Sequence, residues 1–228
     1  MFIGHYAVAL AAKKVAPRTS LGTLFISVQL VDLLWPLMML VGLEHARIDP
    51  GNTAVTPLDF YDYPITHSLV GAVVWSFVLA GIYFAVRRYR RGALIVGLGV
   101  FSHWILDFIT HRPDLALGFS GIYLGLGLWD SLAGTLVIEV VLFVGGLILY
   151  LRSTRGNDKV GTYGLWALAA LLVTIYLTNV FGPPPPDISA IAIVGNASWL
   201  FVLWAYWIDR HRTSVDSARA DEAAGESA

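Results

Sequence analysis

Long apolar stretches separated by short polar segments dominate this chain of 228 residues. Six of them run for 19–23 residues with one charge or none. A helix needs roughly 20 apolar residues to cross the hydrocarbon core of a bilayer, so each run is long enough. The runs are 21–43, 66–86, 92–110, 131–151, 163–181 and 188–208. The pattern therefore predicts an all-α, polytopic integral membrane protein with about six transmembrane helices.

The segments outside these runs divide the chain further. Residues 2–14 are apolar but too short to span, which predicts a short N-terminal helix that either lies in the membrane interface or enters the protein. Four prolines at 183–186 predict a stiff connection between the last two spans. Residues 213–228 are small and acidic, which predicts a disordered cytoplasmic tail. Residues 1–212 are then expected to form a single transmembrane helical domain.

Basic residues are concentrated in alternate loops, whereas the remaining loops hold only Arg47 and Arg112. Under the positive-inside rule this asymmetry predicts that both termini lie in the cytoplasm. The loops 44–65 and 111–130 are then external. The start of the chain shows no cleavable signal pattern, because its apolar stretch precedes the lysines instead of following them.

The composition limits the chemistry that such a protein can carry. Hydrophobic residues make up 57% of the chain and charged residues 14%, whereas a soluble domain carries about a quarter charged residues. Cysteine is absent, which excludes disulfides and thiolate metal sites, so any metal must be held by imidazole and carboxylate groups. The sequence has no basic patch for nucleic acid, and we expect the lipid bilayer to be its main partner.

Ionisable side chains inside the predicted spans are few and unevenly distributed. The first four spans carry Asp32, His67, His103, Asp107 and Glu139, and the last two carry none. Such groups cost several kcal/mol in a membrane unless they are paired or hydrated, and they usually mark function. At 1.5 Å of helical rise per residue, all of them fall in the outer half of the bilayer. They are therefore within reach of one shared cavity if their faces turn inward.

The spacing of two of these groups points to metal binding. His103 and Asp107 are four residues apart, so they share one helix face and can reach a single ion. His111 continues this face at the end of the span, where it could be a ligand, a second-shell donor or a substrate contact. His5 would lie roughly 12 Å deep if the N-terminal helix entered the protein, but could not reach the site if that helix lay flat.

Other polar residues have both a functional and a simpler interpretation. Ser131, Thr135 and Glu139 repeat the four-residue spacing, and such groups can orient metal-binding histidines. Arg112 could hold an anionic head group or be a solvated loop charge. His67 could cap a helix, and a single buried acid such as Asp32 could hydrogen-bond a neighbouring helix without further function.

Five segments, in chain order, resemble the membrane-bound metal-dependent hydrolase family of bacterial inner membranes. They are MFIGHYAVALAAKK, VQLVDLLWPL, YPITHSL, SHWILDFITHRPDL and GLGLWDSLAGTLVIE, and together they fall within residues 1–140. The family is distantly similar to zinc-dependent phospholipase C. The resemblance implies a bacterial inner (plasma) membrane location and a set of metal ligands. These ligands are His5, Asp32, His67, His103 and Asp107, with Glu139 as a sixth.

The leading hypothesis is a metal-dependent hydrolase that acts on a phosphoester of a lipid or another membrane-associated substrate. The His/Asp ligand mix favours zinc, with manganese as the alternative metal. A carboxylate that is not fully committed to metal, Asp32 or Asp107, would act as general base. One alternative is a transporter or channel for divalent cations or protons, and another is a structural or regulatory membrane protein without catalysis.

Overall fold

The computed structural model describes residues 1–119 and 121–215. Within these residues, six helical segments are long and apolar enough to cross a membrane. They are Leu21–Leu40, Leu69–Arg87, Arg90–Thr110, Leu132–Ser153, Lys159–Phe181 and Ile188–Arg210. Each overlaps one of the apolar runs, so the predicted all-α polytopic fold is confirmed.

The first five of these segments are single helices, and the sixth is divided. In chain order the helices are α1 (Ile3–Val15), α2 (Leu21–Leu40), α3 (Pro64–His67), α4 (Leu69–Arg87), α5 (Arg90–Thr110), η1 (Leu128–Asp130), α6 (Leu132–Ser153), α7 (Lys159–Phe181), α8 (Ile188–Gly195) and α9 (Ser198–Arg210). The short helices α8 and α9 are separated by Asn196 and Ala197.

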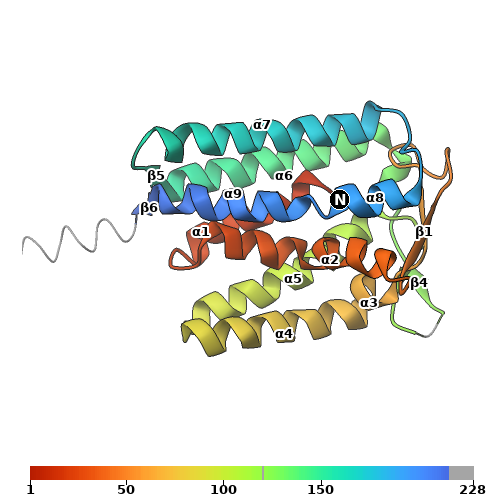
Figure 1. Cartoon of the computed structure of the whole chain (residues 1–228), viewed down its shortest axis with the longest axis horizontal. Helices are drawn as coiled ribbons and strands as arrows, with labels where there is room; N and C mark the ends of the chain where they lie inside the picture. Colours follow the sequence, from red (N-terminus) through yellow and green to blue (C-terminus); the bar gives the residue numbers. More distant parts are fainter. Residues whose placement is uncertain (120, 216–228) are drawn as a thin grey trace, which may run out of the picture.

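The long helices lie side by side along the longest axis of the molecule (Figure 1). One end, on the right of Figure 1, holds the loops 41–63 and 111–131, and we call it the loop end. The other end holds the α4–α5 turn and most of the basic residues between helices, and we call it the basic end. The connection 182–187 joins α7 to α8 at the loop end, as the prolines predicted.

Short antiparallel strand pairs close both ends of the bundle. At the loop end, β1 (His45–Ile48) pairs with β2 (Leu58–Asp62), and β3 (Leu115–Ala116) pairs with β4 (Tyr123–Leu124). At the basic end, β5 (Thr154–Gly156) pairs with β6 (Arg212–Ser214). The β6 strand extends two residues into the segment expected to be a tail, and 216–228 lie outside the described residues.

Polar side chains fix where several of the helices begin. An oxygen of the preceding residue accepts a hydrogen bond from a backbone amide in the first turn, which satisfies a donor that the helix itself leaves unpaired. These residues are Ser20 before α2, Ser68 before α4, Ser131 before α6, Asp158 before α7 and Asp187 before α8. The polar interruptions in the apolar pattern thus become helix starts.

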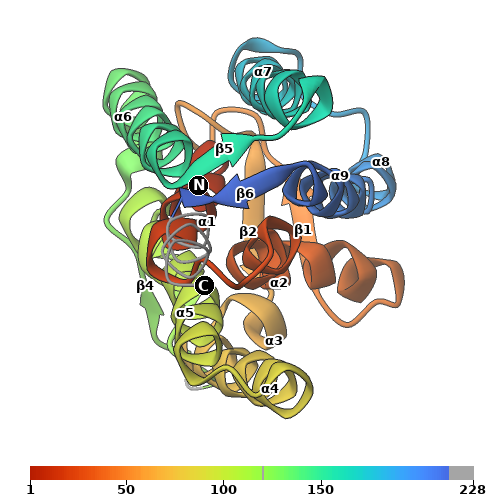
Figure 2. The ribbon, with the colours of Figure 1, turned by 90° about the vertical axis from the view of Figure 1, so that its left-hand side faces the viewer.

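The N-terminal helix α1 enters the protein instead of lying in the interface. It lies in the middle of the bundle when the molecule is viewed from the basic end (Figure 2). A Cβ atom at Gly146 of α6 would lie 2.4 Å from the Ala7 carbonyl oxygen, so α1 packs directly on the α6 backbone. Small residues permit such close approach between membrane helices. Tyr6 and Leu10 are buried in the main apolar cluster, and His5 is carried inward with them.

The outer surface of the bundle is apolar, as lipid contact requires. Helix α4 is the most extreme case, because only 11% of its most apolar window is buried inside the protein. Its Phe77 and Val86 side chains are 78% and 73% exposed. Helices α2 and α5 are instead half buried and carry the polar groups described next.

Candidate metal centre

Two helices, α1 and α5, bring the first group of potential ligands together. His103 and Asp107 lie one turn apart on α5, and His103 Nε2 is 3.0 Å from Asp107 Oδ2. His5 comes from α1, with its Nε2 3.1 Å from Asp107 Oδ1. The imidazole rings of His5 and His103 are stacked, with centroids 3.7 Å apart and planes at 1°. All three residues are buried, so the expected pairing of the α5 residues on one face is confirmed, and α1 adds a third member.

A second group shares His103 with the first. Asp32 lies midway along α2, and its Oδ1 is 3.6 Å from His103 Nε2. His67 ends the short helix α3, and its Nε2 is 3.2 Å from Asp32 Oδ1 and 4.0 Å from Asp107 Oδ2. Ligand atoms within each group, His5–His103–Asp107 and Asp32–His67–His103, all lie within 4.8 Å of one another. Five of the six implied ligands therefore converge.

Hydrogen bonding fixes the orientation of the shared imidazole. The Nδ1–H of His103 donates to the Val28 carbonyl oxygen at 2.6 Å, so in the neutral imidazole the lone pair is on Nε2. That lone pair faces carboxylate oxygens of Asp107 and Asp32, and Nε2 has no hydrogen-bond partner among the described residues. A lone pair facing carboxylates is repulsive, and a proton or a metal ion between them would remove the repulsion. The donor set therefore fits a divalent cation bound by nitrogen and oxygen.

The His67 imidazole is oriented by a chain of two further residues. The Thr66 hydroxyl donates to Glu44 Oε2 at 2.6 Å, so its oxygen is free to accept the Nδ1–H of His67 at 2.7 Å. Glu44 also accepts the Thr66 backbone amide at 2.8 Å and is buried. His67 Nε2 is thus turned toward Asp32 Oδ1, with which it makes a hydrogen bond at 3.2 Å. Metal-binding histidines are commonly oriented by such outer partners. Ser68, not His67, caps α4.

Glu139 is buried next to these groups but has a different local role. Its two carboxylate oxygens accept the backbone amides of Phe2 and Gly4, at 3.0–3.2 Å, where α1 begins. A carboxylate at a helix N-terminus is stabilised by the helix dipole as well as by these bonds. The Met1 amino group donates to Asp107 Oδ1 at 2.6 Å. Glu139 falls outside both ligand groups and anchors the start of α1, and its role as a sixth ligand stays a prediction.

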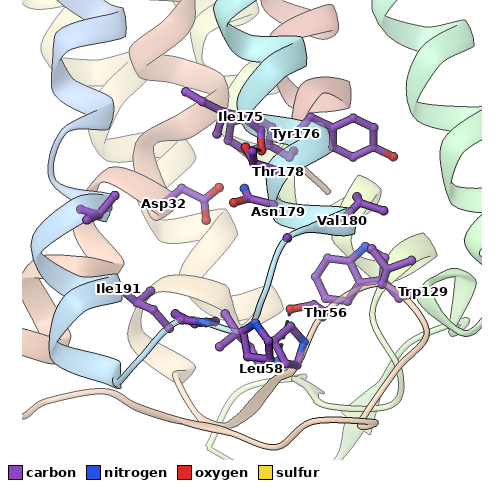
Figure 3. A pocket seen from close by; sticks show the side chains of 18 of the residues that line it. Asp32, Thr56, Leu58, Trp129, Ile175, Tyr176, Thr178, Asn179, Val180 and Ile191 are labelled. Carbon is purple, nitrogen blue, oxygen red and sulfur yellow. Dashed lines mark hydrogen bonds between the residues drawn. The ribbon is translucent and has the colours of Figure 1, made fainter.

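The two groups open into one cavity of about 750 Å³ that reaches toward the loop end. Asp32, His67, Asp107 and Glu139 line one wall. In Figure 3 the Asp32 carboxylate points into this space opposite Asn179 of α7. The side chain of Asp32 is 34% exposed, whereas those of His67 and Asp107 are 6% and 2% exposed. Asp32 is therefore the acid of this cluster that a molecule in the cavity can reach most easily.

The opposite wall is largely apolar and comes from the last two spans. Its residues belong to α7, the proline connection, α8 and α9, and they include Ile175, Val180, Pro183, Ile191, Val194 and Phe201. Two buried polar atoms on the cavity lining, the Tyr176 hydroxyl and Trp35 Nε1, have no hydrogen-bond partner among the described residues. The cavity thus combines a charged wall, an apolar wall and two unpaired donors.

His111 lies at the mouth of the cavity in a cluster of its own. Its Nδ1 is 2.9 Å from Asp114 Oδ1 and 3.2 Å from the Tyr63 hydroxyl, which donates to the same carboxylate at 3.0 Å. The Trp129 ring packs on the imidazole, with centroids 4.1 Å apart. Burial lowers the pKa of the His111 imidazole, and the hydrogen bond with Asp114 opposes this effect. His111 continues the α5 face but lies outside both ligand groups.

Arg112, Ser131 and Thr135 do not take the site positions that the sequence suggested. The Arg112 guanidinium pairs with Asp59 and Asp114 in the outer loops. Ser131 caps α6 through the Gly134 amide, and the Thr135 hydroxyl donates to a main-chain carbonyl of η1. Across the described lining of the cavity, none of the three contributes. Their polar atoms satisfy local structure instead.

Three residues near the site were not predicted from the sequence. They are Glu44, Val28 and Trp35, whose Nε1 has no hydrogen-bond partner among the described residues. Glu44 is 22 residues from Thr66, and no local pattern connects them. A main-chain carbonyl such as that of Val28 has no sequence signal at all. The motif Thr66–His67 is the one available hint, because a hydroxyl beside a histidine can relay its orientation.

Neither a search of protein-family models nor comparisons with curated proteins and with solved structures found a match to this chain.

Proposed function

We propose that this protein is a membrane-embedded, metal-dependent hydrolase that acts on a phosphoester of a lipid or another membrane-associated substrate. The observation that carries the proposal is the convergence of three imidazoles and two carboxylates beside a cavity of about 750 Å³, whose wall includes Asp32, His67 and Asp107. Ionisable groups inside a membrane bundle are costly and are usually retained for function. A packing role would not require five of them to face one another.

The proposal assigns the ligand role to His5, His67, His103 and Asp107, with Asp32 at the exposed side. Because one imidazole nitrogen binds one ion, the shared His103 would serve only one of the two groups. Zinc suits the nitrogen and oxygen donors, and manganese is the alternative. Such an ion supplies Lewis-acid chemistry, polarising a phosphoryl oxygen and making a nearby water more acidic.

Asp32 is the better of the two candidate general bases. Asp107 is 2% exposed and already accepts hydrogen bonds or close contacts from the Met1 amino group, His5 and His103. Asp32 is 34% exposed, points into the cavity and, among the described residues, forms its ion pairs with the imidazoles of His67 and His103. A base must reach the proton of the attacking water, which favours the more accessible carboxylate.

The shape and polarity of the cavity support a lipid substrate. The phosphoester of such a substrate would lie against the charged wall and its hydrocarbon against Ile191 and Val194 of α8. The Trp35 Nε1–H and the Tyr176 hydroxyl would donate to phosphoryl oxygens, since buried donors that lack a partner are costly. A soluble phosphoester would use only one of the two walls.

Hydrolysis is tested with the purified full chain in lipid nanodiscs containing fluorescent acyl-labelled phosphatidic acid or phosphatidylglycerol. Hydrolysis of the bond between the phosphate and the diacylglycerol backbone releases labelled diacylglycerol from either lipid. Thin-layer chromatography detects this product. We expect release with added Zn²⁺ or Mn²⁺ and none with a chelator. Asp32→Asn should reduce the rate by roughly 10²–10⁴-fold, the usual contribution of a general base.

The matched control is Asp158→Asn, which changes an exposed acid at the basic end. It should leave the rate unchanged. Release of diacylglycerol that is insensitive to both the chelator and Asp32→Asn would overturn the proposal, because it would indicate a contaminating enzyme. No release from either lipid by a folded, metal-loaded protein would also overturn it.

A further inference from the structure

A second, smaller pocket lies at the basic end, far along the bundle from the candidate metal centre. It has a volume of about 150 Å³ and is formed where the α1–α2 connection meets the α4–α5 turn. Its lining consists of Arg18, Tyr83, Val86, Arg87 and Tyr89. Its side chains carry two guanidinium groups, which only donate hydrogen bonds, and two phenol hydroxyls, which can donate or accept. Such a set suits a small anion with several acceptor oxygens.

No acidic side chain of the described residues forms an ion pair with Arg18 or Arg87 of this pocket. Arg88, Arg90 and Arg91 flank it and are exposed, so five arginines gather at one corner of the bundle. Among the described residues, arginine ion pairs involve only Arg47 and Arg112 at the loop end. Within the part of the chain that the structure describes, these five positive charges therefore have no acidic partner.

The pocket is also held in shape by contacts of its own. The Arg18 guanidinium lies over the Tyr89 ring, 5.0 Å from its centroid. The Tyr83 hydroxyl hydrogen-bonds Thr19 Oγ1 at 2.9 Å, and both residues are buried. Arg88 ends α4 in the left-handed conformation, with φ of 52°, which turns the chain sharply into α5. These contacts fix the distance between the α1–α2 connection and the α4–α5 turn.

An apolar surface adjoins the pocket on the side that faces lipid. Val86, which lines the pocket, is 73% exposed, and Ile82 one turn away on α4 is 57% exposed. Leu94 on α5 is 62% exposed. A ligand seated between the two guanidinium groups would therefore have hydrocarbon surface directly beside it. A free inorganic anion makes no use of such a surface, but a phospholipid does.

We propose that this pocket binds the phosphate group of an anionic phospholipid, with Arg18 and Arg87 as the charged contacts and the apolar face of α4 beside the acyl chains. Basic pockets between transmembrane helices on the cytoplasmic side are suited to acidic head groups. The positive-inside rule would place this end in the cytoplasm. The proposal does not depend on catalysis at the loop end, because it concerns different residues and a different face of the membrane.

The test is native mass spectrometry of the full chain released from nanodiscs of equal parts phosphatidylglycerol and phosphatidylcholine. Wild type should retain phosphatidylglycerol in preference to phosphatidylcholine. The double variant Arg18→Gln with Arg87→Gln should retain at least about tenfold less phosphatidylglycerol than wild type, because each arginine near an anionic lipid contributes to binding. Arg18→Lys with Arg87→Lys should restore part of the preference, because it keeps the charge but loses the paired donors.

The matched control is Arg152→Gln with Arg155→Gln, which removes the same charge from exposed positions at the basic end but outside the pocket. It should change retention by no more than about twofold. Equal losses from the two double variants would overturn the proposal, because they would reflect general surface charge. A second contradicting result is that millimolar inorganic phosphate displaces phosphatidylglycerol and abolishes the lipid preference. That result would overturn the proposal that the bound phosphate group belongs to a lipid.

Discussion

The two walls of the large cavity differ in almost every physical respect. One wall comes from α2, α3, α5 and α6 and carries buried acids and histidines, which hold one another in fixed orientations. The other comes from α7, α8 and α9, which carry no acidic, basic or histidine side chain within the apolar runs 163–181 and 188–208 and present aliphatic side chains. Both walls belong to helices of similar hydropathy.

The last two spans are therefore more than packing elements. Without ionisable groups in their apolar runs they would seem purely structural, yet they complete the cavity on the side opposite Asp32 (Figure 3). The charged wall would carry the chemistry, and the apolar wall would select what reaches it. Changes on the two walls should therefore have separable effects on metal binding and on substrate binding.

The largest expected effect follows from a change at the centre of the charged wall. Zinc binding should stabilise the wild type by about 2.7 kcal/mol when free zinc is a hundredfold above Kd, because only the folded chain holds the site. Asp107→Asn removes a carboxylate that contacts both His5 and His103. Differential scanning fluorimetry in detergent should show a zinc-dependent rise in Tm for wild type and little or none for the variant.

Asp158→Asn serves as the control for that comparison, because Asp158 is exposed at the opposite end of the bundle. It should keep the full zinc-dependent rise. If zinc raised the Tm of Asp107→Asn as much as that of wild type, zinc would have to bind elsewhere on the protein.

A smaller effect on the same wall should come from Thr66→Val. The substitution keeps the shape of the side chain but removes the hydroxyl that links Glu44 to His67. Loss of such an outer partner commonly weakens metal binding by about 10–100-fold. Titration calorimetry with zinc would measure it. Thr135→Val, which removes another buried hydroxyl from α6, should leave the affinity unchanged.

The apolar wall should respond in a different way. Ile191→Asn places a polar group where a hydrocarbon chain would lie, at a position that lines the cavity. Burial of an aliphatic side chain is worth about 1.5–3 kcal/mol, so KM for a long-chain lipid should rise by about tenfold or more. Bound metal and kcat should stay close to wild type. A matching rise of KM for a short-chain substrate would show that Ile191 does not contact the chain.

The smallest expected effect is that of Arg112→Gln, outside both walls. Its guanidinium is 36% exposed and pairs with Asp59 and Asp114 among the outer loops. Both carboxylates are buried, but the guanidinium is more than a third exposed and Arg47 still pairs with Asp59 in the variant, so chemical denaturation should show a loss of about 1 kcal/mol. Metal content and hydrolysis should be retained. If the variant lost hydrolysis but kept normal stability, Arg112 would have to contribute to substrate binding.

Much of the fold follows from simple features of the sequence. The apolar runs are bounded by Ser20, Ser68, Ser131 and Asp158, whose side chains accept the first free amides of the helices. The short strand pairs at the two ends were not predicted. They join segments such as β5 and β6 that are distant in sequence, and two- or three-residue strands leave no recognisable alternation.

The candidate site was predictable only in part, and the reason is geometric. The spacing of His103 and Asp107 reveals a shared helix face, because both lie on one regular element. The position of His5 depended on whether α1 enters the bundle, which is decided by close packing at Gly146 and not by the pattern of α1 itself. His111 fits the same spacing but ends α5, where its side chain turns to Asp114.

The most direct test of the account is the metal content of the purified wild type beside His103→Ala, with both proteins confirmed as folded in detergent. Inductively coupled plasma mass spectrometry would report the metals without any assumption about substrate. We expect near-stoichiometric zinc or manganese in the wild type and loss of this metal in the variant, because His103 belongs to both ligand groups. Equal, negligible metal in both proteins, even after divalent ions are added back, would contradict it.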